Sequence, residues 1–139
     1  MTAASPYTIR LAIPAIATYQ LLRVAAGLSA KSTEAAAKGL PNSLFAVQVL
    51  LGDEVVGMGR IIGDGGCVFQ VVDIAVLPAH QGKGLGKLIM REVRQFIDSD
   101  VPESAYVSLI ADGQAHRLYA QFGFTVTAPR SVGMAKVVA

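Results

Sequence analysis

Short stretches of alternating or continuous apolar residues divide the chain, which is the pattern of strands in a sheet with a buried face. The stretch YTIRLAI at 7–13 alternates and predicts the first strand. Three more follow closely, LFAVQVLL, VVGMGRII and VFQVVDIAV, at residues 44–51, 55–62 and 68–76. Because only the short turns GDE and GDGG separate them, we expect an antiparallel meander. Further apolar stretches predict strands at 105–111, 124–128 and 132–138.

Apolar residues at helical spacing predict helices over about 14–27, 32–39, 84–97 and 113–123. Pro14 suits the first turn of the first helix, and Ser32 or Thr33 can cap the second. Glycines stand at the ends of three of these helices, at 27, 39 and 123. The mixture of strands and helices predicts an α+β fold with one central sheet.

The composition fits one folded domain over residues 1–139. Hydrophobic residues make up 53% and charged residues 16%, which is enough apolar material for a core and argues against disorder. The net charge of +2 is scattered, whereas a nucleic-acid-binding protein generally carries a clustered basic face. The single cysteine, Cys67, excludes a disulfide within the chain and a cysteine metal cluster.

Targeting and membrane signals are not evident in the sequence. No stretch reaches the roughly 18–20 uninterrupted apolar residues of a membrane span. The start, MTAASPYTIR, lacks the basic and long apolar regions of a secretory signal. We therefore expect a cytoplasmic protein that binds no membrane, no nucleic acid and no metal ion.

The stretch HQGKGLGK at 80–87 follows one predicted strand and opens a predicted helix. A loop in this position directs several backbone N–H groups outward, and the helix dipole adds positive charge there. Alternating glycines remove the Cβ atoms that would keep a phosphate away from these donors. Lys83 and Lys87 add charge, so we expect the loop to bind a phosphate-bearing ligand.

The glycine spacing excludes two common phosphate-binding loops. A Walker A loop needs a glycine, four other residues and then Gly-Lys-Ser/Thr. Here Gln81 stands in place of the first glycine, and Leu88 follows the Gly-Lys pair. A dinucleotide fingerprint needs G-x-G-x-x-G, but the third glycine comes one residue early, at Gly86. A nucleotide-binding protein of either kind is therefore not expected.

The loop does fit the pattern Gln/Arg-x-x-Gly-x-Gly/Ala, from Gln81 to Gly86. In this respect the chain resembles the GCN5-related N-acetyltransferase (GNAT) family, whose loop binds the pyrophosphate of an acyl-CoA. The stretches VVDIAVLP and ADGQAHRLYAQFGF also resemble family segments, and the similarity spans residues 44–126. The resemblance implies a three-layer α+β fold: a mixed, mostly antiparallel sheet of about six to seven strands, helices on both faces, and a cofactor cleft where two strands splay apart.

The resemblance also implies a site for acetyl-CoA as co-substrate, without a metal. In the family, the backbone of the strand before the loop holds the pantetheine arm. The residues of this chain at the family's cofactor-binding positions are Ile74, Ala75, Val76, Gln81, Gly82, Lys83, Gly84, Leu85, Gly86 and Lys87. Asp112 departs from the family's usual asparagine, and a carboxylate cannot donate the hydrogen bond that an amide donates.

Tyr119 occupies the family's Leu-Tyr position and is the expected catalytic acid. Its phenol has an ordinary pKa of about 10, close to that of a thiol, so it can share a proton with a leaving thiolate. The alternative is a core tyrosine that packs against Phe122 and Phe124.

Asp73 interrupts an apolar strand, so its carboxylate is expected to have a specific role. It is a candidate base for the acceptor amine, and the alternative is that it satisfies backbone donors where the strands splay. Arg60, in the neighbouring strand, can pair with Asp73, with Asp64 or with an acidic group of a substrate, and the alternative is an arginine on the surface. Gln70, three residues before Asp73, is expected on the opposite face of the strand.

Together these features predict an acyltransferase that moves an acetyl group from acetyl-CoA to a primary amine of a small molecule or peptide by direct attack. The alternative is a non-catalytic module that binds acyl-CoA and regulates a partner. The segment at 19–40, the strand at 55–62 and the C-terminal strands are expected to wall the acceptor pocket. Because the first segment is rich in alanine and low in charge, it favours a small, partly apolar amine. The apolar stretch VGMAKVV is expected to pair across a homodimer.

Overall fold

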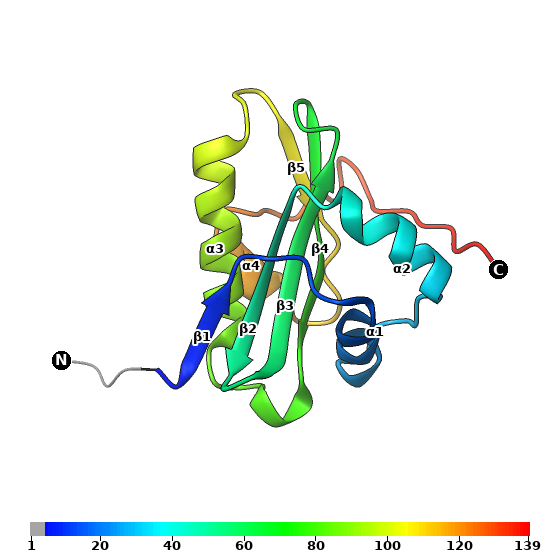
Figure 1. The fold of residues 1–139 in the computed structure, drawn as a ribbon. Coiled ribbons are helices and arrows are strands. Elements are labelled where there is room, and N and C mark those ends of the chain that lie inside the picture. The colour runs from blue at the N-terminus through cyan, green and yellow to red at the C-terminus, as the bar shows by residue number, and fades with distance from the viewer. Residues whose placement is uncertain (1–4) are drawn as a thin grey trace.

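The protein is built around one five-stranded sheet, seen in a computed structural model that describes residues 5–139 (Figure 1). The strands lie side by side in sequence order: β1 (Tyr7–Arg10), β2 (Phe45–Leu51), β3 (Glu54–Gly63), β4 (Val68–Val76) and β5 (Tyr106–Leu109). The pairs β1–β2, β2–β3 and β3–β4 are antiparallel, and the pair β4–β5 is parallel. The meander predicted for β2, β3 and β4 is confirmed.

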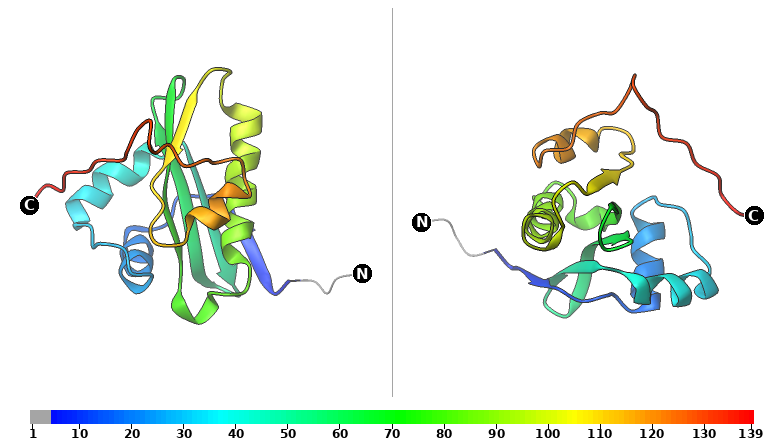
Figure 2. Two further views of the ribbon diagram at one scale, coloured as in Figure 1. Left: turned by 180° about the vertical axis from the view of Figure 1, so that it is seen from behind. Right: turned by 90° about the horizontal axis from the view of Figure 1, so that it is seen from above.

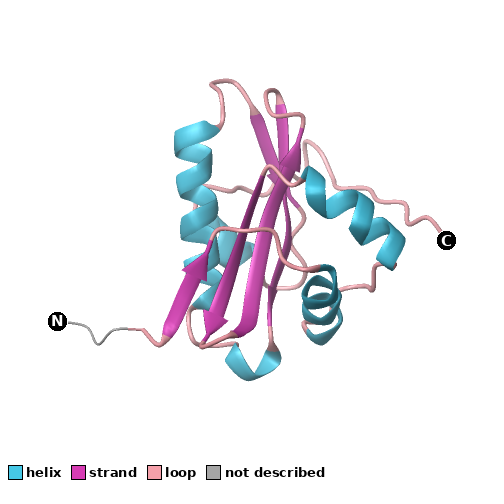
Figure 3. Cartoon of the chain, in the orientation of Figure 1, coloured by secondary structure: helices cyan, strands magenta, loops and turns pink. Residues whose placement is uncertain are grey.

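Helices cover both faces of this sheet (Figures 2 and 3). They are α1 (Ile16–Ala25), α2 (Thr33–Gly39), α3 (Leu85–Asp100) and α4 (His116–Ala120), with 3-10 turns at Leu40–Asn42 and Pro78–His80. Because α1 and α2 lie on one face and α3 and α4 on the other, the three-layer α+β arrangement is confirmed. Ser32 caps α2 by accepting a hydrogen bond from the N–H of Ala35 at 3.0 Å. None of the helices within residues 5–139 has the length and apolar character of a membrane span.

Each face of the sheet buries its own apolar cluster. The cluster under α3 is formed by Val47, Val49, Val56, Ile61, Phe69, Val71, Leu85, Ile89, Met90, Val93 and Tyr119. The cluster under α1 and α2 is formed by Tyr19, Leu22, Ala36, Leu40, Met58 and Ala75. Gly59 lets β3 approach α3 closely, since a Cβ there would lie 2.8 Å from Cγ2 of Ile89. The sheet is therefore held between two cores, and both contribute residues to the site described below.

The sheet has five strands, and the expected number of about six to seven is wrong. The stretches at 124–128 and 132–138 form no strand and run along an exposed C-terminal tail (Figure 1). An apolar stretch becomes a strand only where a neighbouring strand takes up its backbone hydrogen bonds. The pattern of a single segment does not reveal whether that neighbour exists. The first strand ends at Arg10, earlier than expected, although β2 extends three residues beyond the partner of Arg10, Gln48.

Candidate functional site

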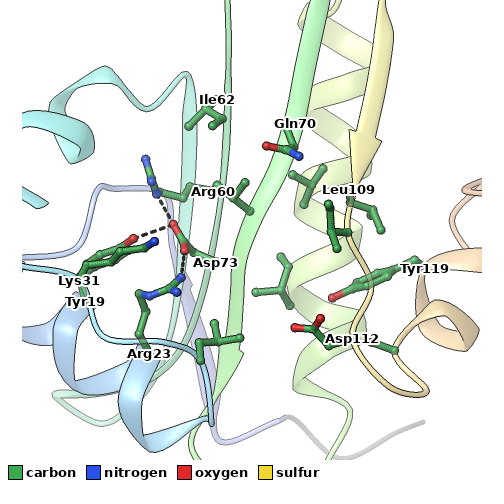
Figure 4. Close-up of a pocket in the computed structure, with 16 residues that line it drawn as sticks. Tyr19, Arg23, Lys31, Arg60, Ile62, Gln70, Asp73, Leu109, Asp112 and Tyr119 are labelled. Atoms are coloured by element: carbon green, nitrogen blue, oxygen red, sulfur yellow. Dashed lines mark hydrogen bonds and ion pairs between the residues drawn. The ribbon is translucent and has the colours of Figure 1, made fainter. Parts of the chain in front are cut away.

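β4 and β5 separate part of the way along the sheet, and a cavity lies over the gap. Their parallel pairing stops at Val71 and Leu109, where β5 ends. β4 continues to Val76, so its last residues have no strand beside them on that edge. A cavity of about 470 Å³ crosses the gap from α1 to α4 (Figure 4). The splayed cleft that the resemblance implied is therefore present at this end of the sheet.

A β-bulge at Asp73 changes which side chains face the cavity. Asp73 has a positive φ of 59°, and the register shifts so that Asp73 and Ile74 stand opposite the single residue Gly59. One residue is thereby inserted into the alternation of the strand. Gln70 and Asp73 consequently line the same cavity, and the expectation that they face opposite sides is wrong.

Asp73 is enclosed by three donor side chains on the wall formed by α1 and β3 (Figure 4). Its Oδ2 accepts hydrogen bonds from Nε of Arg60 at 2.6 Å and from the hydroxyl of Tyr19 at 3.1 Å. Its Oδ1 accepts one from Nη1 of Arg23. The Asp73 side chain is 5% exposed. The pairing with Arg60 is therefore confirmed, and both carboxylate oxygens are already engaged by side chains rather than by backbone donors.

The ring of Tyr19 lies close to both guanidinium groups. The guanidinium carbons of Arg60 and Arg23 lie 5.6 Å and 6.0 Å from the centre of its ring. Burial raises the pKa of the Tyr19 phenol and the Asp73 carboxylate raises it further, while the two guanidiniums act in the opposite direction. The phenol therefore keeps its proton at neutral pH and donates it to the hydrogen bond with Asp73.

Tyr119 lines the opposite wall of the same cavity, where α4 places it. Its ring belongs to the core cluster under α3, as the alternative interpretation expected, and its hydroxyl points into the cavity (Figure 4). Burial raises the pKa of this phenol, and the negative charge of the nearby Asp112 raises it further. Tyr119 is therefore protonated at neutral pH and able to donate.

The loop at 81–87 lies at the end of the sheet where β4 and β5 have separated. Gly82 and Gly84 have positive φ values of 77° and 82°, which glycine adopts without strain. The first helical hydrogen bond of α3 runs from the N–H of Leu88 to Gly84, so the N–H groups of residues 82–87 have no backbone acceptor in the described chain. A Cβ added at Gly82 or Gly84 would meet no atom within 4 Å. The loop therefore presents open donors that fit a phosphate group.

Three other residues of the loop have contacts within the protein, and one of them, Leu85, is buried in the core under α3. Gln81 donates a hydrogen bond from Nε2 to the carbonyl of Val76 at 3.0 Å, which ties the loop to the end of β4. A Cβ on Gly86 would lie 2.9 Å from Cδ2 of Leu118, so this glycine permits the contact between α3 and α4. The glycine pattern of the loop thus serves helix packing as well as access to the backbone.

Sequence reasoning did not single out three polar side chains of the cavity: Tyr19, Arg23 and Lys31. All three come from the segment at 19–40, and the expectation that it offers few charges to the pocket is wrong. One signal was available. Arg23 follows Leu22 on the buried face of α1, and a buried arginine requires a partner.

The expected walls of the pocket are only partly correct. The segment at 19–40 and the strand at 55–62 do line the cavity with Asp73 and Tyr119. The C-terminal residues instead line a second cavity of about 710 Å³, beside β5 and α4. Within residues 5–139, no group of three or more His, Cys, Asp and Glu side chains is arranged to hold a metal ion.

Comparisons with known proteins are consistent with this architecture. The family described as Acetyltransferase (GNAT) domain matches residues 42–126. A solved structure from meticillin-resistant Staphylococcus aureus, described as a protein of unknown function and probable acetyltransferase, is 50% identical with a TM-score of 0.91, and the match covers 95% of this chain and 99% of that one. A GNAT family acetyltransferase from Streptococcus pneumoniae is 27% identical with a TM-score of 0.76, over 95% and 98% of the two chains.

Curated relatives are matched over a shorter region. The chain is 35% identical over 72 residues to GCN5-related N-acetyltransferase 2, chloroplastic, of Arabidopsis thaliana. It is 34% identical over 71 residues to histone acetyltransferase TAP1 of Glycine max. The matches cover 51% and 50% of this chain but 27% and 29% of those proteins, so the chain spans less than a third of their length.

Proposed function

Because the chain belongs to the GNAT family of acetyltransferases, we propose that it moves an acetyl group from acetyl-CoA to a primary amine of a small molecule or peptide. The observation that carries this proposal is a coincidence of three features at one end of the sheet. They are the open donors of the loop at 81–87, the unpaired edge of β4 and the hydroxyl of Tyr119. A phosphate, an extended chain and a reacting centre can therefore be held in succession.

The loop residues Gln81 to Lys87 are proposed to hold the pyrophosphate, with donors supplied mainly by the backbone of residues 82–87 and charge by the two lysines. The pantetheine arm is proposed to lie along the free edge of β4. The N–H of Leu77 donates to the carbonyl of Val56 at 2.9 Å, so by alternation the backbone of Ala75 also faces β3. The backbone of Ile74 and the N–H of Val76 then face the gap, while the carbonyl of Val76 accepts from Gln81. Ile74 and Val76 are therefore better placed than Ala75 to bind the arm.

When bound, acetyl-CoA supplies a thioester whose carbonyl is attacked by the amine and whose sulfur leaves as a thiolate. The N–H of Val76 faces the gap and would stabilise negative charge on a carbonyl oxygen placed there. Tyr119 retains its proton at neutral pH because its pKa is raised by burial and by Asp112. Its hydroxyl, which faces the cavity, then donates that proton to the leaving sulfur.

Asp73 is proposed to position Arg23 and Arg60 rather than to act as the base. Its two oxygens accept three hydrogen bonds, and its side chain has little contact with solvent. An amine proton would have to displace one of these donors to reach it. The proton of the amine therefore leaves through water in the open cavity.

The test of the proposed function is thiol release from acetyl-CoA by the purified protein across a panel of primary amines and lysine peptides. We expect release above the amine-free rate with at least one acceptor. Acetyl-CoA binding without release by any acceptor would support the non-catalytic module instead. Failure to bind acetyl-CoA at all would refute the role proposed for the loop.

The raised tyrosine pKa values give a pH prediction. The chain has four tyrosines and no tryptophan, so the ultraviolet absorbance of tyrosinate reports them cleanly. Tyr19 and Tyr119 should each ionise above the ordinary phenol pKa of about 10. Because the folded protein then holds these protons more tightly than the unfolded chain, stability should fall as the pH rises above about 10.

The Asp112→Asn variant separates the two causes of the raised pKa of Tyr119, which are burial and the charge of Asp112. Removing the carboxylate should shift one of the two late transitions to lower pH, and Tyr119→Phe should remove that transition. Rapid pH jumps, read before the protein unfolds, give the measurement. Ionisation of Tyr19 and Tyr119 at the ordinary phenol pKa of about 10 would contradict the prediction.

A homodimer is proposed from the C-terminal tail. Four of its apolar side chains, Val132, Met134, Val137 and Val138, are 68–91% exposed, and the outer edge of β5 has no partner strand in the described chain. Pairing with a second copy would cover both. Deleting residues 129–139 should therefore convert a dimer into a monomer in light scattering. A full-length chain that already runs at 14.5 kDa would contradict this proposal.

A further inference from the structure

Charges are unevenly distributed across the cavity of about 470 Å³. Three cations, Arg23, Lys31 and Arg60, line the wall formed by α1, the segment after it and β3 (Figure 4). Asp73 is the one carboxylate among them, and Asp112 lies across the gap beside Tyr119 (Figure 4). One wall therefore keeps two uncompensated positive charges, while the reacting end carries a negative one.

The arginines are held rigidly and one of them keeps free donors. Arg23 donates hydrogen bonds from Nε to the carbonyl of Ser29 and from Nη2 to the hydroxyl of Ser29. Its Nη1 donates to Oδ1 of Asp73. Arg60 donates hydrogen bonds from Nε to Oδ2 of Asp73 and from Nη1 to the hydroxyl of Ser43, the latter at 3.0 Å. Its Nη2 has no hydrogen-bond partner within residues 5–139. A guanidinium fixed in this way binds an anion at a low cost in side-chain entropy.

Lys31 provides the second free donor group of this wall. Its ammonium forms no ion pair or hydrogen bond with the described part of the chain. Lys31 and Arg60 both line the main cavity and also an adjoining cavity of about 210 Å³. Asp73 is already engaged by Arg23, Arg60 and Tyr19, so its carboxylate is not paired with the lysine. Its charge is available to a ligand.

We infer that the acceptor is a small amine that also carries an anionic group, a carboxylate or a phosphate, held between Nη2 of Arg60 and the ammonium of Lys31. This inference rests on the proposed function. The amine would lie towards Asp112 and Tyr119, because the negative charge of Asp112 attracts an ammonium group and the cationic wall repels it. A cavity of this volume suits a small molecule. The partly apolar amine that the alanine-rich sequence favoured would leave the cationic wall without a partner.

The experiment compares pairs of amines that differ only in the anionic group. The pairs are 4-aminobutyrate with butylamine, 6-aminohexanoate with hexylamine, and O-phosphoethanolamine with ethanolamine. We expect the anionic member of at least one pair to have a kcat/KM about ten- to a hundredfold higher, mainly through a lower KM, as for a hydrogen bond between charged groups. The carboxylate and phosphate pairs together identify which anion the site accepts.

Lys31→Met is the decisive variant, with Lys38→Met as its control. Both lysines are exposed and both changes remove one positive charge, but Lys38 lies on α2 and lines none of the cavities described above. Lys31→Met should raise the KM of the anionic acceptors about tenfold or more and leave that of the matched amines unchanged. Lys38→Met should change neither.

The outcomes separate this inference from the proposed function. Turnover of both members of every pair with equal kcat/KM, unchanged in Lys31→Met, would overturn the inference and leave the acetyltransferase standing. If no amine supports thiol release, calorimetric titration of the same six compounds decides the inference by itself. Binding of an anionic member that is lost in Lys31→Met would support it, and equal or absent binding of all six would overturn it.

Discussion

Tyr119→Phe is expected to lower kcat for amine acetylation by about 10²- to 10⁴-fold, the range typical of a lost general acid. The hydroxyl faces the cavity across from Asp73, and its raised pKa keeps it protonated at neutral pH. Without it, the sulfur must leave as an unprotonated thiolate. The affinity for acetyl-CoA should hardly change, because the proposed binding contacts come from the loop at 81–87 and the edge of β4. Steady-state thiol release and a calorimetric titration with acetyl-CoA measure the two quantities.

Tyr106→Phe is the matched control for this variant. Tyr106 lies on β5 and is 58% exposed. It shares the second cavity with Tyr119 but does not line the cavity of about 470 Å³ that contains Asp73 and the Tyr119 hydroxyl. The same atom is removed in both variants, so a general effect of losing a phenol would appear in each. The ring of Tyr119 is retained by phenylalanine, and the core under α3 should keep its packing. Equal turnover in the two variants would remove Tyr119 from the mechanism.

The strands of the meander and the start of α2 were predictable because local sequence patterns specify them. The three central strands and the turns between them follow from apolar periodicity and glycine position. The start of α2 follows from Ser32, whose side chain satisfies a helix N–H. In the loop at 81–87, glycine spacing correctly pointed to open backbone donors, because positive φ at Gly82 and Gly84 is a local property.

The bulge in β4 could not be read from the sequence. Asp73 adopts a positive φ that aspartate visits only at a cost, and what stabilises it there comes from α1 and β3. These partners are distant in the chain, so no local sequence pattern predicts them. The bulge brings Gln70 and Asp73 into one cavity and gathers the arginines around the carboxylate. The largest error about the site therefore came from a feature that exists only in the tertiary structure.

The prediction of two strands in the C-terminal tail was wrong for a related reason. Its apolar residues suggested two strands, but a strand exists only where its backbone pairs with a neighbour, and the tail pairs with no strand of the described chain. β5 is only four residues long and gives way to the gap after Leu109. The structure leaves the tail extended and its apolar side chains in solvent. Coverage of these side chains by a second copy depends on association between chains, which the pattern of one sequence does not predict.

The charge cluster around Asp73 links the stability of the fold to the acceptor site. The side chains of Asp73, Arg23 and Arg60 are 5%, 10% and 12% exposed. Transferring such charges out of water is costly, and the cost is offset only while each has its partner. The single carboxylate neutralises part of two guanidiniums and fixes their direction. A change at Asp73 should therefore lower stability first and acceptor binding with it.

Asp73→Asn is expected to destabilise the protein by about 3 kcal/mol, the lower end of the range for breaking a buried ion pair. Asparagine is the suitable replacement because it also tolerates the positive φ of 59° at this position, so the backbone keeps its bulge. The side chain loses its charge, and an NH2 donor replaces one of the two oxygens that accept from the arginines and Tyr19. Urea unfolding followed by circular dichroism measures the change in the free energy of unfolding. The control is Asp98→Asn, which removes an exposed carboxylate 3.7 Å from Arg94 and should change stability far less. Equal unfolding midpoints for the two variants would show that Asp73 does not hold the arginines against a desolvation cost, and the anion site proposed between Arg60 and Lys31 would lose its rigid support.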